Sequence, residues 1–269
     1  MARRARHRRA RFVALVVAAT ITVVACSPLY GPPPTALRGT LYYGNTFDAC
    51  TAPTVQQMSA WRSTFGGVGV YIGGANRACG QPQLTPGWIG SVKAQNWHLL
   101  PLYVGLQAPC ISFNAARIDP AHASQQGIAA ANDAANQAQA LGLGARSPIF
   151  FDMEAYGRDP ACIDAVRSFV NAWVYQLHQR GYVAGLYSSS ASGMADQDAV
   201  YNNRLYRKPD VIWFANWDGR KSVFNDPYIN NAHWANHQRH HQYQGGHDET
   251  RGGVTINIDR SLSDGSVAA

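Results

Sequence analysis

The chain has 269 residues, of which 14% are charged, and a formal net charge of +7. Residues 1–25 hold six of the 23 basic residues and none of the 16 acidic ones, so the remainder carries 17 − 16 = +1. This balance lacks the basic excess typical of nucleic-acid binding, and we expect no nucleic-acid partner. The remainder, about 230 residues, has the size of a single α/β barrel.

The N-terminus predicts export. Six arginines precede an apolar run at 12–25, which is too short to span a bilayer permanently and has the flanks of a secretory signal peptide. The run ends Val-Val-Ala before Cys26, which resembles a bacterial lipobox, and we expect Cys26 to carry a membrane-anchoring lipid. Ordinary signal peptidase could also cut before Cys26. The paired arginines also suggest export by the twin-arginine route, although Arg11 stands where that motif prefers an apolar residue.

We therefore expect three regions: a signal peptide over 1–25, a lipid-anchored Pro-rich tether over 26–37, and a barrel domain over 38–269. Four prolines and a glycine make the tether an extended spacer without core residues. Such a protein would lie in the cell envelope, anchored to the membrane or secreted. The oligomeric state is not predicted.

Strand-like and helix-like segments alternate through the rest of the chain. Short apolar runs bounded by turn residues predict strands, and capped segments with a 3.6-residue period predict helices. The expected strands are 40–48, 67–74, 98–107, 148–154, 183–188, 210–217, 241–244 and 254–259, and the main helices are 54–65, 85–96, 121–141 and 160–180. This order predicts the α/β class and a single (β/α)8 TIM-type barrel. Its last strands should be irregular, because residues 218–240 are polar and loop-like.

The stretch from Pro148 to Glu154 carries the strongest functional signal. A short apolar run after a helix-breaking proline predicts a buried strand, and alternation along it points Asp152 and Glu154 the same way. Repulsion and desolvation should separate the pKa values of the two carboxyl groups, and we expect Glu154 to be the protonated member. Such a pair suits acid-assisted cleavage of a glycosidic bond. Two solvated acids at an ordinary strand end are the alternative.

Further acids and aromatic residues fall at the predicted C-terminal strand ends, where barrels of this kind carry their chemistry. Aromatic faces and multidentate polar groups bind sugars, so we interpret this rim as a glycan cleft. The substrate-binding candidates are Asp48, Tyr187, Trp217, Gln242, Tyr243, Glu249 and Asp259.

The cysteines predict disulfides rather than a metal site. If Cys26 carries lipid, four cysteines remain, and in an oxidising compartment two disulfides are the default. Three pairings are possible; closeness in sequence favours Cys50–Cys79 and Cys110–Cys162. The chain has no C-x-x-C pair, which disfavours a zinc or thioredoxin-type site.

Five histidines between 233 and 247 suggest a second possible metal site. His237 and His241 have the spacing of a helical ligand pair. The segment is rich in Asn, Gln and Arg and lacks H-E-x-x-H, so we expect a solvated loop and no metal. No Walker loop, G-x-G-x-x-G or G-x-S-x-G is present, which argues against a nucleotide cofactor and a serine hydrolase. No cofactor is expected.

Several motifs resemble known families. The segments FDME, GLYSS, WFANW, HQY and NID resemble the GH25 lysozymes, which are (β/α)8 muramidases with a D-x-E pair on strand four. The segments FDACTAP, YIGGANRAC, PLYVGLQAPC, FDMEAY and HQYQGGHDET are more similar to the glycoside-hydrolase-like domain of unknown function in secreted actinobacterial proteins. This resemblance covers residues 41–265.

The resemblance implies roles for four acids. Glu154 corresponds to the lysozyme catalytic acid and Asp152 to the carboxylate that orients the acetamido group of the substrate. Asp48 and Asp259 correspond to supporting acids. The implied activity is hydrolysis of cell-wall glycan. Residues 245–250 depart from the lysozyme pattern, so the alternative is a non-catalytic glycan-binding protein that retains the cleft.

Overall fold

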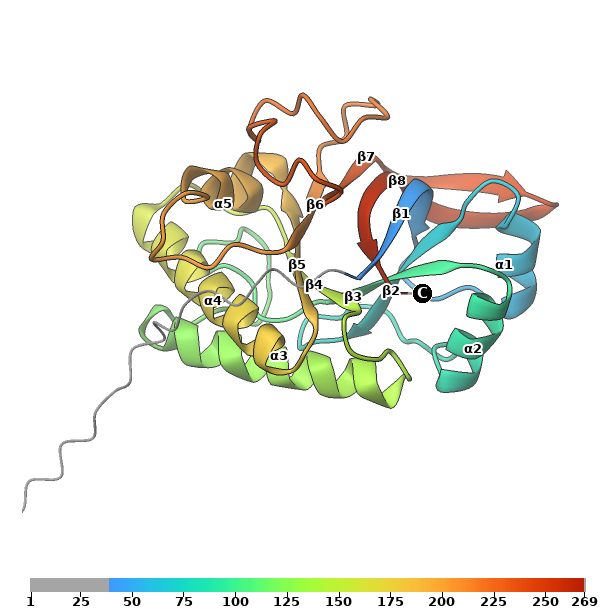
Figure 1. The fold of residues 1–269 in the computed structure, drawn as a ribbon, viewed down its shortest axis with the longest axis horizontal. Helices are drawn as coiled ribbons and strands as arrows, with labels where there is room; N and C mark the ends of the chain where they lie inside the picture. Colours follow the sequence, from blue (N-terminus) through green and yellow to red (C-terminus); the bar gives the residue numbers. More distant parts are fainter. Residues whose placement is uncertain (1–38, 269) are drawn as a thin grey trace, which may run out of the picture. The chain divides into compact units, whose positions relative to one another are not determined.

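The computed structural model describes residues 39–268, which form a closed barrel of eight strands in sequential order (Figure 1). This confirms the predicted α/β barrel. The strands are β1 (Thr40–Asp48), β2 (Gly67–Gly73), β3 (His98–Tyr103), β4 (Pro148–Met153), β5 (Val183–Ser189), β6 (Val211–Ala215), β7 (Arg239–Arg251) and β8 (Val254–Val267). The helices are α1 (Val55–Trp61), α2 (Pro86–Ala94), α3 (Ala123–Ala140), α4 (Pro160–Gln179) and the short α5 (Ala195–Ala199), one between each pair of strands from β1 to β6.

Local capping explains where the helices begin. Thr54 precedes α1, and its side chain accepts a hydrogen bond from the backbone of Gln57 while the Gln57 side chain accepts one from the backbone of Thr54. Thr85 and Asp159 cap α2 and α4 in the same position, each followed by a proline in the first turn. The predicted helix starts therefore lie within two residues of the observed ones.

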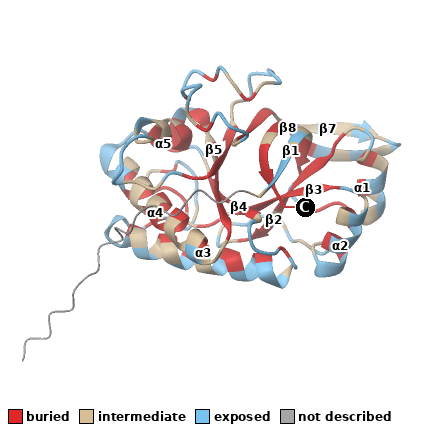
Figure 2. Cartoon of the chain, viewed as in Figure 1, coloured by how far each residue is buried: buried red, intermediate tan, exposed pale blue. Residues whose placement is uncertain are grey.

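The core lies between the barrel and the helices, with a smaller apolar cluster inside the barrel. Strands β2 to β6 are buried on nearly all sides, while the helices expose their outer faces (Figure 2). Helices α3 and α4 pack closely at Gly127, where an added Cβ would lie 2.4 Å from the carbonyl oxygen of Phe169. Inside the barrel, Leu102, Phe150 and Trp213 fill the space below the cavity described next.

The last two strands depart from a regular (β/α)8 pattern and are much longer than predicted. Strand β8 runs antiparallel to both β7 and β1, and no helix joins β6 to β7 or β7 to β8 in the part of the chain described. Gly252 and Gly253, both with positive φ, turn the β7–β8 hairpin. Its tip packs on α1, where the Trp61 indole donates to the Val254 carbonyl at 3.1 Å. Residues 245–250, which depart from the lysozyme pattern, belong to β7.

Two other expectations are corrected. Strand β3 ends at Tyr103 and β6 at Ala215, so Gln107 and Trp217 lie in the loops that follow. The histidine segment is not simply a solvated loop. His240 and His241 are buried in β7, and desolvation lowers the pKa of His240 to about 3.

The disulfide pairing is confirmed, with bonds Cys50–Cys79 and Cys110–Cys162. Within residues 39–268, no three His, Cys, Asp or Glu side chains are arranged to hold a metal ion. None of the described helices has the length and apolar character needed to cross a membrane. The expectations for residues 1–37, including lipidation of Cys26, lie outside the described residues.

Candidate functional site

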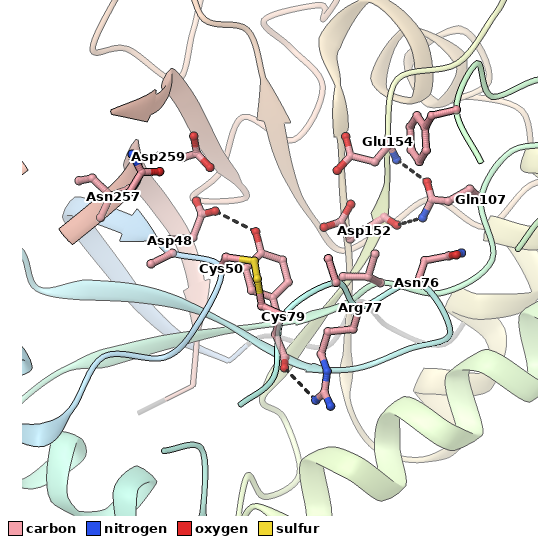
Figure 3. Close-up of a pocket in the computed structure, with 16 residues that line it drawn as sticks. Asp48, Cys50, Asn76, Arg77, Cys79, Gln107, Asp152, Glu154, Asn257 and Asp259 are labelled. Atoms are coloured by element: carbon pink, nitrogen blue, oxygen red, sulfur yellow. Dashed lines mark hydrogen bonds between the residues drawn. A yellow bond between two sulfur atoms is a disulfide. The ribbon is translucent and has the colours of Figure 1, made fainter. Parts of the chain in front are cut away.

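A cavity of about 370 Å³ opens at the C-terminal ends of β1 and β4, where β8 passes beside them (Figure 3). This volume falls in the range of small-molecule sites. Four carboxyl groups line it, those of Asp48, Asp152, Glu154 and Asp259. The sequence predicted all four, and the structure brings them together in one cavity.

The first pair of acids comes from neighbouring antiparallel strands, because Asp48 of β1 lies opposite Asp259 of β8. Asp48 is 1% exposed, and its two oxygens accept hydrogen bonds from the Tyr71 hydroxyl (3.0 Å) and the Gln242 amide (3.1 Å). Desolvation, followed by the charge of Asp259, raises the pKa of Asp48 to about 8. Burial also raises the pKa of Asp259, and its hydrogen bond with Asp48 opposes that rise. Burial and the neighbouring charge of Asp259 therefore favour the protonated form of Asp48 at neutral pH.

The second pair lies at the end of β4 and is held by Gln107. The Gln107 amide donates to the Asp152 carbonyl and accepts from the Glu154 backbone N–H, both at 2.8 Å. Burial, then the charges of Glu154 and Asp48, raises the pKa of Asp152 well above its usual value. Asp152 is only 3% exposed, and its Oδ1 atom has no hydrogen-bond partner.

Glu154 is more accessible, and its carboxyl group lies above that of Asp152 and faces Asp259 (Figure 3). Burial, then the charge of Asp259, raises its pKa. We had expected Glu154 to be the protonated member of the β4 pair. In the free protein the pKa values of both acids are raised, and that of Asp152 is raised further. The charge of Glu154 thus favours the protonated form of Asp152 in the free protein.

Three of the predicted substrate-binding residues form a hydrogen-bond network behind the cavity and do not line it. The Tyr187 hydroxyl and the Trp217 indole both donate to Gln242 Oε1, at 3.0 and 2.9 Å. Because two donors occupy that oxygen, the amide nitrogen of Gln242 must face Asp48. The Trp217 ring lies against Gly245 and remains 66% exposed.

Two predicted residues lie elsewhere. Tyr243 packs with Val223 and Leu262 in a separate apolar cluster. Glu249 makes ion pairs with Arg251 at 2.5 Å and Arg260 at 3.3 Å. Neither lines the cavity.

The sequence reading did not single out Tyr71, Arg77 or Phe113, which also line the cavity. Alternation along β2 could have indicated Tyr71, since it is four residues past the strand start. No local pattern marks Phe113 or Arg77, because both lie in loops whose course depends on the disulfides.

A closed α/β barrel with a cluster of carboxyl groups at the C-terminal end of its first and fourth strands defines a glycoside-hydrolase-like protein. The family model described as "Rv2525c-like, glycoside hydrolase-like domain" matches residues 59–263, and the chain belongs to this family. The resemblance expected from the motifs is confirmed. No curated protein matches the chain significantly.

Solved structures share the fold. An uncharacterized protein of B. stearothermophilus is 21% identical, with a TM-score of 0.54 over 82% of this chain and 95% of that one. The Mycobacterium tuberculosis Tat-secreted protein Rv2525c, in complex with L-tartrate, is 16% identical, with a TM-score of 0.60 over 85% and 100%. The modular autolysin LytC from Streptococcus pneumoniae is 15% identical, with a TM-score of 0.50 over 82% and 46%. At these identities the likeness is one of fold.

Proposed function

We propose that the protein is an exported glycoside hydrolase that cleaves a cell-wall glycan with acid assistance. The observation that carries the proposal is the group of four carboxyl groups in one cavity at the barrel rim, every one with a raised pKa. Enzymes that transfer protons at neutral pH often use acidic side chains in a cleft whose pKa values are raised.

Glu154 is the proposed general acid, because it is the more accessible member of the β4 pair. Its proton passes to the glycosidic oxygen as the bond from that oxygen to the anomeric carbon breaks. Water then adds its oxygen to the anomeric carbon. If an intermediate forms first, Glu154 takes the proton of this water; in a direct attack Asp152 takes it, and exchange with solvent reprotonates Glu154. The protein therefore ends the cycle in its starting protonation state.

Asp152 is the proposed partner of the positive charge that develops on the sugar. Asp152 lines the cavity, and a carboxylate oxygen there can accept a hydrogen bond from the N–H of an acetamido group. Such a bond stabilises ionised Asp152, whose charge then favours the protonated form of Glu154. Substrate binding would thus set the protonation states that the reaction needs.

Asp48 and Asp259 support this pair. Because Asp48 is neutral near pH 7, the cavity carries less negative charge than four ionised acids would produce. Asp259 is the charge that acts most strongly on Glu154, so its ionisation helps to keep the proton on the general acid.

Export and a cell-wall polysaccharide as partner rest on separate support. Two disulfides favour an oxidising compartment, and the N-terminal sequence predicts a signal peptide. Among the proteins of similar fold, Rv2525c is described as Tat-secreted and LytC as an autolysin. We further propose that lipid on Cys26 holds the protein at the membrane.

The test is to incubate the purified mature protein with peptidoglycan and with arabinogalactan and to measure new reducing ends. Glu154→Gln should lower the rate by about 10²–10⁴-fold, as expected for loss of a general acid, and Asp152→Asn should be comparably damaging. The control is Asp164→Asn on α4, whose side chain is 73% exposed and away from the cavity lining. Wild-type activity of folded Glu154→Gln would contradict the proposal. Binding of glycan without release by the wild type would instead support the non-catalytic alternative.

A further inference from the structure

We infer that Phe113 forms a sugar-binding subsite beside the acids, on a loop that the Cys110–Cys162 disulfide holds in place. We call residues 108–116 the Phe113 loop. The inference rests on the proposed function, because it assigns a glycan ring to the same cavity.

The Phe113 side chain is an exposed aromatic ring in a cavity that also holds four carboxyl groups. It is 48% exposed and lines the cavity together with Glu154. The other large aromatic side chains exposed in the described chain, Tyr43, Trp217 and Tyr228, do not line it. A flat apolar ring next to polar groups suits a pyranose, which presents C–H groups on one face and hydroxyl groups at its edge.

Hydrogen bonds fix both the base and the tip of the Phe113 loop. The Gln107 backbone N–H donates to the Ala116 carbonyl at 2.9 Å and closes the base. The side chain of Asn76 bonds both the N–H and the carbonyl of Ala116, each at 2.9 Å. Near the tip, the Arg117 guanidinium donates to the Phe113 carbonyl at 3.0 Å. The backbone that carries the ring therefore has few alternative positions.

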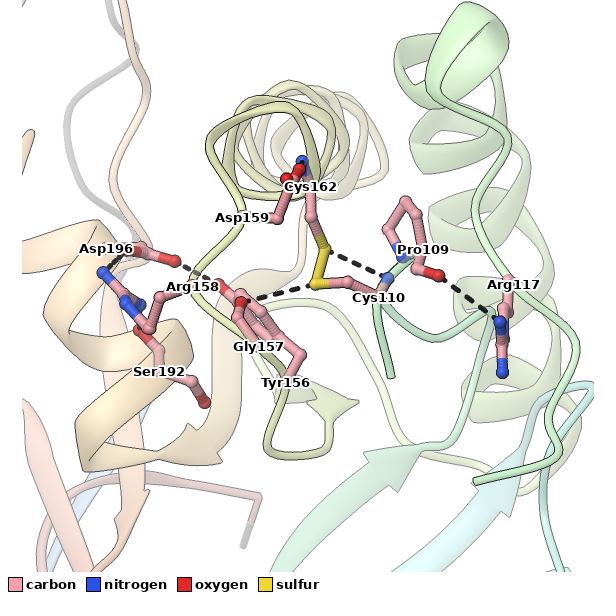
Figure 4. Close-up of a disulfide and its surroundings, with 10 residues drawn as sticks. All are labelled: Pro109, Cys110, Arg117, Tyr156, Gly157, Arg158, Asp159, Cys162, Ser192 and Asp196. Atoms are coloured by element: carbon pink, nitrogen blue, oxygen red, sulfur yellow. Dashed lines mark hydrogen bonds and ion pairs between the residues drawn. A yellow bond between two sulfur atoms is a disulfide. The ribbon is translucent and has the colours of Figure 1, made fainter. Parts of the chain in front are cut away.

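The disulfide adds a covalent restraint. Cys110 in the loop is bonded to Cys162 in the first turn of α4, and its backbone N–H also points at the Cys162 sulfur, 3.1 Å away (Figure 4). The Cys110 sulfur lies 3.3 Å from the carbonyl of Gly157, in the segment between β4 and α4. The loop is thus tied to the segment that follows the catalytic strand.

Gln107 links the loop to the acids. Its backbone closes the Phe113 loop, and its side chain holds the backbones of Asp152 and Glu154. The backbone that carries Phe113 is therefore held relative to the proposed general acid before the ligand binds. Such pre-organisation avoids the entropy cost of ordering a loop on binding.

The ligand class that follows is an oligosaccharide in which a ring next to the scissile bond rests on Phe113. The experiment uses the Glu154→Gln protein, so that binding is measured without hydrolysis, and isothermal titration calorimetry with a tetrasaccharide of alternating N-acetylglucosamine and N-acetylmuramic acid. The double variant Glu154→Gln, Phe113→Ala should bind the tetrasaccharide about threefold to tenfold more weakly than Glu154→Gln alone, the range for one aromatic contact. Phe113→Tyr should retain the affinity, whereas Phe113→Leu, which is apolar but lacks a flat face, should lose most of it.

The matched control is Tyr43→Ala, because Tyr43 is an exposed aromatic residue in the first half of β1, away from the cavity. It should leave the affinity unchanged. If the Glu154→Gln protein binds the tetrasaccharide and Phe113→Ala binds it equally well, the subsite is refuted while the proposed function stands. If the Glu154→Gln protein does not bind it at all, both are refuted for this glycan.

Discussion

The protonation of Asp48 should make the protein less stable as the pH rises from 6.5 to 8, and Asp48→Asn should reduce this dependence. The pKa of Asp48 is about 8 in the folded protein, against 3.8 for an ordinary aspartate. Between these values the folded state holds a proton that the unfolded state has released. Unfolding is therefore favoured by raising the pH, and the loss is complete once the pH exceeds the folded pKa.

The magnitude follows from proton linkage. One proton changes the free energy of unfolding by about 1.36 kcal/mol per pH unit. His240 has the opposite effect on stability below pH 6.5. Its pKa is about 3 in the folded protein, so the unfolded state takes up a proton there that the folded state does not, and stability falls as the pH is lowered. The raised pKa of Asp152 also lowers stability as the pH rises, and Asp48→Asn leaves that contribution in place. Over pH 6.5–8 the ionisation of Asp48 alone should lower the free energy of unfolding by about 2 kcal/mol. For a domain of about 230 residues this corresponds to a fall in Tm of roughly 4–8 °C.

The assay is thermal unfolding followed by circular dichroism at pH 6.5, 7, 7.5 and 8. Asn at position 48 cannot ionise and can still accept the hydrogen bond from Tyr71, so the variant should lose the contribution of Asp48 to the slope. Asp164→Asn, which removes an exposed carboxyl group, should keep the wild-type slope. Equal slopes for the wild type and Asp48→Asn would refute the protonation of Asp48 at neutral pH.

Three further outcomes are expected. Gln242→Leu removes a hydrogen bond that lowers the pKa of Asp48, so the pH-dependent loss of Tm should move to higher pH; an unmoved profile would contradict the role given to this amide. Replacing Cys110 and Cys162 together by serine should destabilise the fold by about 2–4 kcal/mol in denaturant unfolding, and an unchanged midpoint would argue against a stabilising bond. Cys26→Ala should release the protein from the membrane fraction, whereas a soluble wild type would contradict the anchor.

Much of the barrel could be predicted from the sequence because its signals are local. The first strand was placed at Thr40–Asp48, as observed, and the start of α1 followed from Thr54 as a capping residue. The hairpin of β7 and β8 was predicted far too short. For β7 the sequence marked 241–244, inside the barrel, and missed the half-exposed polar extension to Arg251. For β8 it marked 254–259 and missed the continuation to Val267, whose mostly small and polar residues pair with β1 and carry no clear hydrophobic alternation.

The sequence alone determined that Asp152 and Glu154 share one side of a buried strand, since alternation along a strand needs only local geometry. It also singled out Asp48 at the end of the first strand. Tertiary structure decided how they combine. The Gln242 amide reaches Asp48 across 194 positions of chain, and the antiparallel entry of β8 sets Asp259 opposite Asp48. The pKa values depend on burial and on neighbours distant in sequence, and these arise only when the barrel closes.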